Sequence, residues 1–512
     1  MEISSWKAHW ANWSESRTAL RFEGTEISYG ELEDRVARLA GLLRRSGLTG
    51  GDRVAYLGPN SPELLETLFA CARLGAIFVP LNTRMPPAEL RVFLQQSTPH
   101  AILAEESLLE TARASGPALA AEIVAFSAGG GIGKPTPTDL LPVRAEPGAD
   151  PSAPVLILFT SGTTGTPKGA VMTREAVAAN AIATALAFGM NASDQVLTFT
   201  PMFHIAGLNL LTTPALFAGA TVTVHRTFDP RSILQDIESI PATLLLVPPA
   251  MTRDLVAHPA WQHTDLASLR CVMTGGATVT EPSVQCWSER GIPVIQGYGM
   301  TEAGSNASLV PIHVTPDKSL TAGKPTFGAE VRIVDASGRD VGPGGHGQIA
   351  VRSPTMMQGY WQNPKATRQA IQNGWLHTGD LGFIDEEGYL HVVERIKEII
   401  IVGASNVSPA DLEAVLIESP DIEGAVVVGR PDEKLGEVPV AFVVPATGGA
   451  LTEDWVMSLF EGRLAPYKHP REVIFLAVLP RTSVGKPHKA ALRAMASRGL
   501  ERPSWTGPGH HL

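Results

Sequence analysis

The stretch Thr-Ser-Gly-Thr-Thr-Gly-Thr-Pro-Lys-Gly at residues 160–169 decides the fold class of this chain. It follows the apolar, strand-like run at residues 155–159. Glycines free backbone N–H groups to face a ligand, and hydroxyl and ammonium groups add further donors. The stretch therefore predicts a loop that binds phosphate. A mobile surface loop is the simpler alternative, but this much donor chemistry beside a buried strand disfavours it.

A Walker A loop does not account for this stretch. That motif needs Ser or Thr directly after its lysine, and here Lys168 is followed by Gly169. The stretch resembles instead the phosphate loop of the adenylate-forming superfamily, which includes acyl-CoA synthetases, peptide-synthetase adenylation domains and beetle luciferases. The resemblance implies that ATP is held by the loop residues Thr160, Ser161, Gly162, Thr163, Thr164, Gly165 and Lys168.

Length and composition bound the class of protein. At 512 residues the chain should hold more than one domain, and its hydrophobic content of 44% is ordinary for a soluble globular protein. The net charge of −10 argues against nonspecific nucleic-acid binding. Three widely spaced cysteines, Cys71, Cys271 and Cys286, predict buried thiols in a reducing compartment. With neither a signal-peptide pattern nor an apolar run of ~18 residues, we expect a cytoplasmic protein without integral membrane contact.

Alternating strand and helix signals predict an α/β fold with a largely parallel sheet. Ser28 and Glu31 have the spacing of a capping box, and Ser61-Pro62 predicts the N-cap and first position of another helix. Thr173 is expected to cap a third helix directly after the phosphate loop.

The chain is predicted to contain a large and a small domain. The large domain, residues 1–393, is expected to bind AMP and the acyl group. It should combine two αβ-layered subdomains with a small β-barrel-like part. A hinge at residues 394–397 leads to a small mobile α+β domain at 398–500 and a loose tail at 501–512.

The segment Pro-Met-Phe-His-Ile-Ala-Gly at residues 201–207 follows a strand-like run. Alone, a histidine beside phenylalanine is commonly a packed core residue. The segment is similar to the one in which the superfamily places an aromatic residue and a histidine beside the acyl site, which implies a pocket role for His204. Amino-acid-activating relatives carry an acidic residue here. Residues 203–209 contain none, so an uncharged, non-amino acyl chain is expected.

Two further segments are expected to bind the nucleotide. Thr-Gly-Gly-Ala at 274–277 alone would be a tight turn, but its glycines also let a flat ligand approach the backbone. The segment at 296–302 resembles the family motif that places adenine on Tyr298, phosphate at Thr301 and Mg²⁺ on Glu302, with Thr160 as a second metal ligand. Mg²⁺ prefers carboxylates together with substrate phosphates. The implied nucleotide contacts are Gly275, Gly276, Ala277, Gln296, Gly297, Tyr298, Gly299, Met300 and Thr301.

Motifs in the last third of the chain resemble the remaining parts of the family's site. Asp380 and Arg395 match the two ribose contacts, although an aspartate after glycine is by itself usually a turn residue. Lys397 matches the hinge position, and Gly403 lies in the loop beside which the thiol enters. Lys486 matches the catalytic lysine of the C-terminal loop, where a lone lysine would otherwise serve solubility.

The resemblance spans roughly residues 10–495 and implies a two-step ligase that uses ATP, Mg²⁺ and CoA. A carboxylate attacks the α-phosphorus of ATP and releases pyrophosphate; CoA thiol then attacks the acyl-adenylate and releases AMP. The implied catalytic residues are Lys486, Lys168, Thr301, Glu302 and His204. Small residues around the pocket predict room for a medium, long or bulky acyl chain: Ala206, Gly207, Gly275, Ala303, Gly304 and Ser305.

Three residues depart from the family pattern. Ala404 replaces a second glycine, Pro487 replaces an aliphatic residue after the catalytic lysine, and Gln348 replaces a common glutamate. The first two leave open an enzyme that only converts a supplied acyl-adenylate into a thioester. Acylation of a carrier protein, a non-catalytic nucleotide-binding regulator and a luciferase-like oxygenase are further alternatives. The sequence does not determine the oligomeric state, for which a homodimer is a guess.

Overall fold

The structure is a computed structural model, and it describes residues 3–116, 121–132, 150–160, 167–276, 279–312, 318–403, 405–446, 451–481 and 486–498. The chain divides into two compact units. The first unit comprises Met1–Arg332, Ala350–Thr378 and Ile384–His391, and the second comprises Ile333–Ile349, Gly379–Phe383 and Val392–Leu512. The domain boundary expected after residue 393 stays a prediction.

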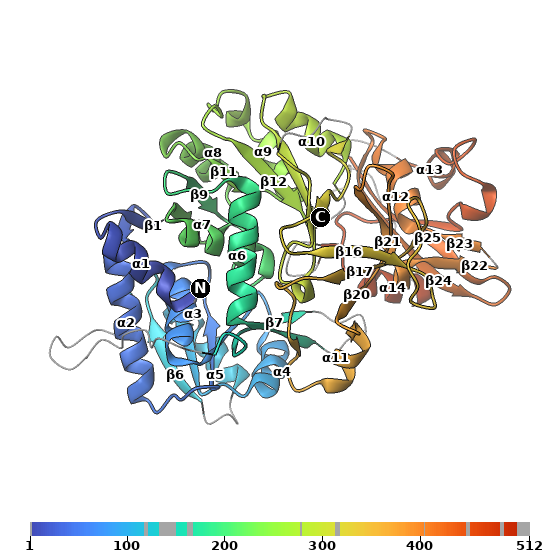
Figure 1. Cartoon of the computed structure of the whole chain (residues 1–512). Helices are drawn as coiled ribbons and strands as arrows, with labels where there is room; N and C mark the ends of the chain where they lie inside the picture. The colour runs from blue at the N-terminus through green and yellow to red at the C-terminus, as the bar shows by residue number, and fades with distance from the viewer. Residues whose placement is uncertain are drawn as a thin grey trace, which may run out of the picture. The chain divides into compact units, whose positions relative to one another are not determined.

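A nine-stranded sheet forms one half of the first unit (Figure 1). In spatial order its strands are β15 (Lys324–Pro325), β14 (Ser308–Leu309), β13 (Val294–Tyr298), β12 (Cys271–Gly275), β11 (Leu244–Leu246), β9 (Gln195–Thr198), β10 (Thr221–Val224), β1 (Thr18–Phe22) and β2 (Thr25–Ser28). The central strands from β13 to β1 run parallel. Their carboxyl ends therefore meet at one edge, where α/β proteins commonly bind ligands.

A seven-stranded sheet forms the other half. Its strands in order are β18 (Gly359–Tyr360), β8 (Lys168–Thr173), β7 (Pro154–Thr160), β4 (Ile77–Pro80), β3 (Arg53–Leu57), β5 (Ala101–Glu105) and β6 (Glu122–Phe126). The pairs from β7 to β6 are parallel, whereas β8 and β18 are antiparallel to their neighbours. The prediction of a largely parallel sheet is therefore confirmed.

Helices cover both sheets and bury their apolar residues. They are α1 (Trp6–Trp13), α2 (Tyr29–Arg45), α3 (Pro62–Leu74), α4 (Pro87–Ser97), α5 (Leu109–Ser115), α6 (Arg174–Phe188), α7 (Thr212–Ala218), α8 (Pro230–Ser239), α9 (Pro249–Ala257), α10 (Glu281–Ser288) and α11 (Pro364–Ala370). Helix α6 contacts both β8 and α7, and α7 packs on the nine-stranded sheet, so α6 lies between the sheets (Figure 1). One core joins α8, α9 and α10 to β12 and β13, and a second joins α4 and α5 to the seven-stranded sheet.

The second unit contains a five-stranded sheet of its own. Its strands are β23 (Ser405–Val407), β22 (Ile400–Val402), β25 (Gly436–Pro445), β24 (Ile422–Asp432) and β26 (Glu472–Phe475), with helices α12 (Pro409–Ile417), α13 (Glu453–Ser458) and α14 (Lys489–Arg498). Another five-stranded sheet contains the places where the chain passes from one unit to the other. Its strands are β16 (Glu330–Val334), β17 (Gly347–Arg352), β20 (Trp375–Ile384), β19 (Ile371–Gln372) and β21 (Leu390–Arg395).

Local sequence signals correctly predicted the starts of α2, α3 and α6. The Ser28 capping box is formed, and the Thr173 side chain accepts from the third residue of α6. Ser61 lies at the N-cap of α3 as expected, but its hydroxyl does not cap the helix. The Ser61 hydroxyl instead forms a hydrogen bond with the buried Tyr56 hydroxyl, at 2.8 Å.

The cysteine prediction holds for two of the three residues. Cys71 and Cys271 are buried, and all three thiols are free. Burial raises the pKa of Cys271 to about 12, so this thiol is inert. Cys286 is only partly buried, because α10 directs Val284 and Trp287 rather than Cys286 into the core.

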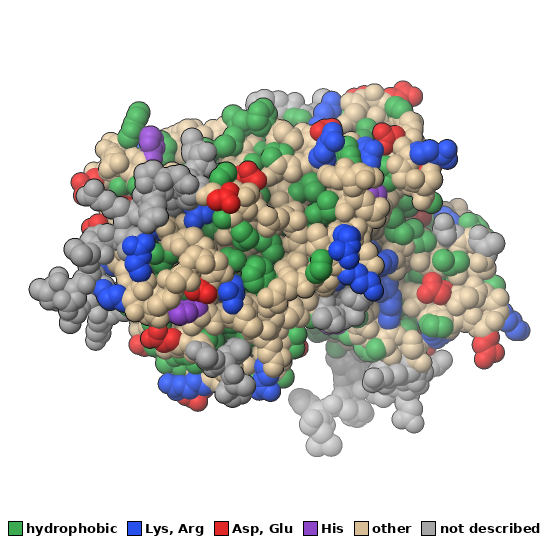
Figure 2. Space-filling view, turned by 60° about the horizontal axis from the view of Figure 1, so that its bottom comes forward, with side chains coloured by type: hydrophobic (Ala, Val, Ile, Leu, Met, Phe, Trp, Pro, Cys, Tyr) green, Lys and Arg blue, Asp and Glu red, His purple; other side chains and the backbone are tan. Residues whose placement is uncertain are grey.

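The surface carries mixed chemistry. Figure 2 shows one face, on which hydrophobic, acidic and basic side chains lie interspersed. Among the residues that the structure describes, none forms a helix long and apolar enough to cross a membrane.

Candidate active site

Glu302 is a buried carboxylate at the centre of the first unit's site. It lies in the short helix η5 (Thr301–Ala303) directly after β13, and it is 7% exposed. The Tyr360 hydroxyl donates to Glu302 Oε1 at 2.8 Å, and Thr160 Oγ1 lies 3.5 Å from the same oxygen. Within the described part of the chain, no Lys, Arg or His nitrogen forms an ion pair with it. Because an unpaired buried charge is costly, this environment fits a bound cation.

The donor set around Glu302 suits Mg²⁺. The described residues contain no cluster of three or more His, Cys, Asp or Glu side chains that could enclose a metal ion. Mg²⁺ does not need such a cluster, because it commonly binds one or two carboxylates together with substrate phosphates. One carboxylate and the Thr160 hydroxyl would therefore suffice beside a triphosphate.

Both ends of the phosphate loop lie beside Glu302. Thr160 ends β7 and pairs in register with Lys168, which begins β8, and Thr160 Oγ1 donates to the Lys168 carbonyl at 3.3 Å. The Lys168 ammonium lies 5.2 Å from the centre of the Tyr360 ring. The intervening candidates Ser161, Gly162, Thr163, Thr164 and Gly165 lie outside the described residues.

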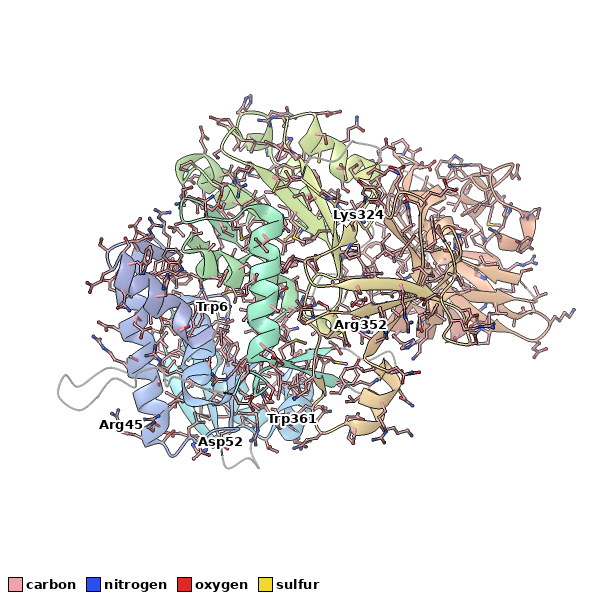
Figure 3. All side chains as sticks on the ribbon, in the orientation of Figure 1. Trp6, Arg45, Asp52, Lys324, Arg352 and Trp361 are labelled. Carbon is pink, nitrogen blue, oxygen red and sulfur yellow. The ribbon has the colours of Figure 1, made fainter. Side chains whose placement is uncertain are left out.

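Sequence reasoning missed Tyr360. This residue lies in the two-residue strand β18, which pairs with β8 directly after the phosphate loop. The next residue, Trp361, labelled in Figure 3, donates from its Nε1 to the Gln96 carbonyl of α4 at 3.2 Å and so anchors the segment. A Gly-Tyr-Trp run carries no periodicity or spacing that marks it as functional, so only the fold could reveal it.

The carboxyl ends of β12 and β13 present buried polar atoms that have no hydrogen-bond partner. Thr274 pairs in register with Gln296, and both Thr274 Oγ1 and Gln296 Oε1 lack a partner in the described structure. A Cβ added at Gly276 would meet nothing within 4 Å, so space is open beside this edge. Unsatisfied buried groups beside open space fit a polar ligand such as the base of a nucleotide. Tyr298 ends β13 at the same edge, whereas Ala277 lies outside the described residues.

Several of the predicted site positions require glycine, because main-chain atoms lie close to the α-carbon there. A Cβ at Gly299 would lie 1.6 Å from the Ser305 carbonyl oxygen. At Gly304 it would lie 1.8 Å from the Thr355 carbonyl oxygen, and at Gly207 it would lie 2.2 Å from that of Pro201. These glycines therefore allow main-chain segments to pack closely. This does not support the expected roomy acyl pocket at Gly207 and Gly304.

His204 lies between β9 and a π-helical turn (Ala206–Leu210) in the predicted acyl segment. The Ala206 N–H donates to His204 Nδ1 at 3.3 Å. In this arrangement the neutral imidazole carries its proton on Nε2. The ring is partly buried, so the structure neither packs it fully into the core nor leaves it on the surface.

The second unit brings three predicted residues together. Asp380 of β20 is 4% exposed, and its Oδ1 lies 2.8 Å from Arg395 Nε of β21. Desolvation by the surrounding protein lowers the pKa of the Lys486 ammonium, and Arg395 adds to the lowering, whereas Asp380 and Glu398 oppose it. The Lys486 side chain is nevertheless exposed to solvent, which is consistent with its predicted contact with a ligand.

The remaining candidates lie near these residues in the chain. Lys397 is in the 3₁₀ turn η7 (Ile396–Glu398) after β21, and Gly403 has a φ of 63° at the end of β22. Ala404 lies outside the described residues. Pro487 forms an isolated antiparallel bridge with Arg481, which closes the loop that carries Lys486.

Comparison with known proteins identifies the family of this chain. A sequence profile described as AMP-binding enzyme matches residues 7–361, and one described as AMP-binding enzyme C-terminal domain matches 411–486. The chain is 43% identical to an indoleacetate–CoA ligase of Aromatoleum aromaticum, with 97% of this chain and 99% of the relative covered. It is 39% identical to a feruloyl-CoA synthase of an Amycolatopsis species, with 96% and 98% covered.

A solved structure supports the same assignment. The o-succinylbenzoate CoA synthetase of Bacillus subtilis, in complex with ATP and magnesium, is 30% identical with a TM-score of 0.85, and the alignment covers 96% of this chain and 98% of that one. The chain therefore belongs to the AMP-binding enzyme family. It is an AMP-forming acid–thiol ligase that uses ATP, Mg²⁺ and CoA to convert a carboxylic acid, through an acyl-adenylate, into an acyl-CoA.

Proposed function

We propose that the substrate is a carboxylic acid that carries an aromatic ring. The observation that carries this proposal is the near full-length similarity to relatives named for indoleacetate and ferulate, together with the likeness to a ligase named for o-succinylbenzoate. All three acids combine an aromatic ring with a carboxylate. The absence of acidic side chains from residues 203–209 is consistent with an acyl group that has no ammonium.

A matched pair of substrates tests the proposal. Phenylacetate and octanoate have the same number of carbon atoms, but only the first has a ring. With ATP, Mg²⁺ and CoA, AMP release should show a kcat/KM at least about 10-fold higher for phenylacetate, the scale of a pocket fitted to one shape. An equal or higher value for octanoate would overturn the proposal. Indoleacetate and ferulate would then rank the ring-bearing acids.

The roles of the site residues follow from charge and position. Glu302 and Thr160 are proposed to hold Mg²⁺, Lys168 and the loop hydroxyls to hold the β- and γ-phosphates, and Thr301 to contact phosphate. Lys486 is proposed to bind the carboxylate and the α-phosphoryl oxygens, where charge develops. The attacking carboxylate needs little activation, so these groups act by positioning and charge neutralisation.

The nucleoside end has its own proposed contacts. The edge formed by Gly275, Gly276 and Gln296 to Met300 is proposed to receive adenine, with the ring of Tyr298 against it. Asp380 and Arg395 are proposed to bind the ribose, and His204 is proposed to border the acyl group. The unpartnered Thr274 and Gln296 oxygens support the adenine assignment.

The second half-reaction needs different groups at the same bond, so we propose that the chain turns at Lys397 between the two halves. Gly403 would then lie beside the CoA thiol. Lys397→Pro should slow thioester formation by about 10-fold more than adenylation, because proline fixes the backbone torsion that a hinge must change. Pyrophosphate exchange without CoA measures the first half alone. Equal losses in the two halves would contradict the hinge.

Compartment and assembly also remain proposals. We propose a cytoplasmic location, because the reaction consumes ATP and CoA. A homodimer is testable by light scattering of the purified chain, where a monomer mass would contradict it.

A further inference from the structure

Lys489 lies three residues after Lys486, at the first position of α14. Its ammonium donates to Glu398 Oε2 at 2.7 Å and lies 3.6 Å from Glu413 Oε1. The Lys489 side chain is only 20% exposed, and the two carboxylates are similarly shielded. Such a partly buried, two-partner ion pair holds its groups more firmly than an exposed surface pair.

The two carboxylates belong to the segment of the proposed hinge and to α12. Glu398 follows the proposed hinge residue Lys397 within η7. Glu413 lies on α12 and also accepts the Val427 N–H of β24 at 2.9 Å. A third carboxylate, Glu394, accepts the Ala410 N–H at the start of α12 at 2.9 Å. The segment after β21 is therefore fixed to α12 and to the first turn of α14.

The electrostatics show that this cluster is a single unit. Burial by itself would lower the pKa of Lys489, but Glu413, Glu398 and Glu394 together hold it above its ordinary value. Glu398 also acts on the neighbouring Lys486, where it favours the charged ammonium. One carboxylate thus pairs with Lys489 and influences Lys486.

We propose that Lys489 is a positioning residue for adenylation: by joining Glu398 to Glu413, it fixes the base of the loop that presents Lys486. Backbone contacts support the same loop. The His488 N–H donates to the Pro480 carbonyl at 2.8 Å, and Pro487 pairs with Arg481. These contacts join the two ends of the loop. They do not determine the direction in which Lys486 points, which depends on the start of α14. Without the ion pair, α14 loses its side-chain tie to η7, and Lys486 would sample more orientations.

The inference rests on the proposed role of Lys486 in adenylation, so Lys486→Ala is measured in parallel. The test variant is Lys489→Met, which keeps the length of the side chain and removes its charge. Lys489→Arg keeps the charge. Lys468→Met is a matched control, because Lys468 lies in the same unit and its ion pair, with Asp411 at 3.7 Å, does not include Glu398 or Glu413.

Two assays separate the half-reactions: pyrophosphate exchange with ATP and acid, and thioester formation from a supplied acyl-adenylate and CoA. Lys489→Met should lower the kcat of exchange about 10-fold, the scale of misplacing a reacting group. It should leave the KM for ATP and the thioester rate within about 2-fold. Lys489→Arg should recover most of the exchange rate, and Lys468→Met should behave as the wild type.

The outcomes distinguish this inference from the proposed function. If Lys486→Ala leaves exchange unchanged, the proposed role of Lys486 fails. If Lys486→Ala abolishes exchange and Lys489→Met does not change it, only the positioning role fails. Equal losses in both half-reactions would also overturn it, because a general structural defect would then explain them. Should Lys489→Met not fold, Glu398→Gln weakens the same pair and must give the same selective loss.

Discussion

Glu302 and Asp380 are both buried carboxylates of the predicted nucleotide site, but their charge environments are opposite. Glu302, in the first unit, is approached only by the hydroxyls of Tyr360 and Thr160 among the described residues. Asp380, in the second unit, lies 2.8 Å from the Arg395 guanidinium. Burial alone therefore does not distinguish the proposed metal ligand from the proposed ribose ligand, whereas the partner of each carboxylate does. A buried carboxylate that has no cationic side chain as a partner is suited to binding a metal ion.

The same contrast extends to the lysines. Lys168 lies over an aromatic ring beside the loop that should hold phosphate, whereas Lys486 lies exposed among Arg395, Asp380 and Glu398. The first unit thus presents groups that need a ligand to balance them. The second presents a cluster in which the acidic groups of Asp380 and Glu398 lie near the basic groups of Arg395 and Lys486.

Lys486→Ala should have the largest effect. Adenylation should fall by about 10²–10³-fold, the scale for losing one preorganised electrostatic donor. Conversion of supplied acyl-adenylate to thioester should continue at nearly the wild-type rate. Pyrophosphate exchange and thioester formation measure the two halves, and an unchanged exchange rate would contradict the assignment.

Replacing each of the two carboxylates with its amide should reveal the difference between their charge environments. Glu302→Gln should lower the rate about 10²-fold, because the proposed metal loses its charged ligand. The free energy of unfolding without Mg²⁺ should not fall, since a buried amide is less costly than an unpaired charge. Asp380→Asn should instead lose about 1 kcal/mol, because it breaks an ion pair that is partly exposed at Arg395.

Urea unfolding of both variants in the absence of Mg²⁺ provides the comparison. Loss of stability in Glu302→Gln, or none in Asp380→Asn, would remove the contrast on which the two assignments depend.

Tyr360→Phe sharpens the role of the missed residue. It removes the hydroxyl that donates to Glu302 but keeps the ring beneath Lys168. The Mg²⁺ concentration for half-maximal activity should rise about 10-fold, the usual scale for losing a partner of a metal ligand. The kcat at saturating Mg²⁺ should change little. A fall in kcat with an unchanged Mg²⁺ requirement would place Tyr360 elsewhere in the mechanism.

The effect of Glu413→Gln should be visible in the pH dependence of stability. Burial raises the pKa of Glu413 to about 7, against the lowering by Lys489 and the Val427 N–H, while Glu394 and Glu398 raise it further. The folded chain therefore keeps this proton between about pH 4.5 and 7, where the unfolded chain has released it. Stability from this group is full below pH 4.5 and is lost as the pH rises through 7.

The variant should remove this slope, which amounts to a change of about 2–3 kcal/mol between pH 5 and 8. Urea unfolding of the wild type and of Glu413→Gln at pH 5, 6, 7 and 8 measures it. Parallel curves for the two proteins would show that Glu413 titrates with its ordinary pKa.

Local elements followed directly from the sequence. The Ser28 capping box and the Thr173 cap each depend on groups three residues apart. Such contacts form within one turn, so their spacing can be read without the fold. Family resemblance supplied the ligase chemistry in the same way, because its motifs are short and contiguous.

Contacts between distant residues could not be read from the sequence. Tyr360 reaches Glu302 across 58 residues, and Lys489 reaches Glu398 across 91. Gly207 was expected to leave room for the acyl chain, yet the Pro201 carbonyl occupies the space beside its α-carbon. A residue type states which interactions a side chain can make, whereas the packed chain alone decides which neighbour makes them. By itself, the sequence indicated the starts of α2, α3 and α6 and, through the family resemblance, the class of reaction. The tertiary structure decided the charge balance of each carboxylate, because that balance depends on partners that only folding brings within a few ångströms.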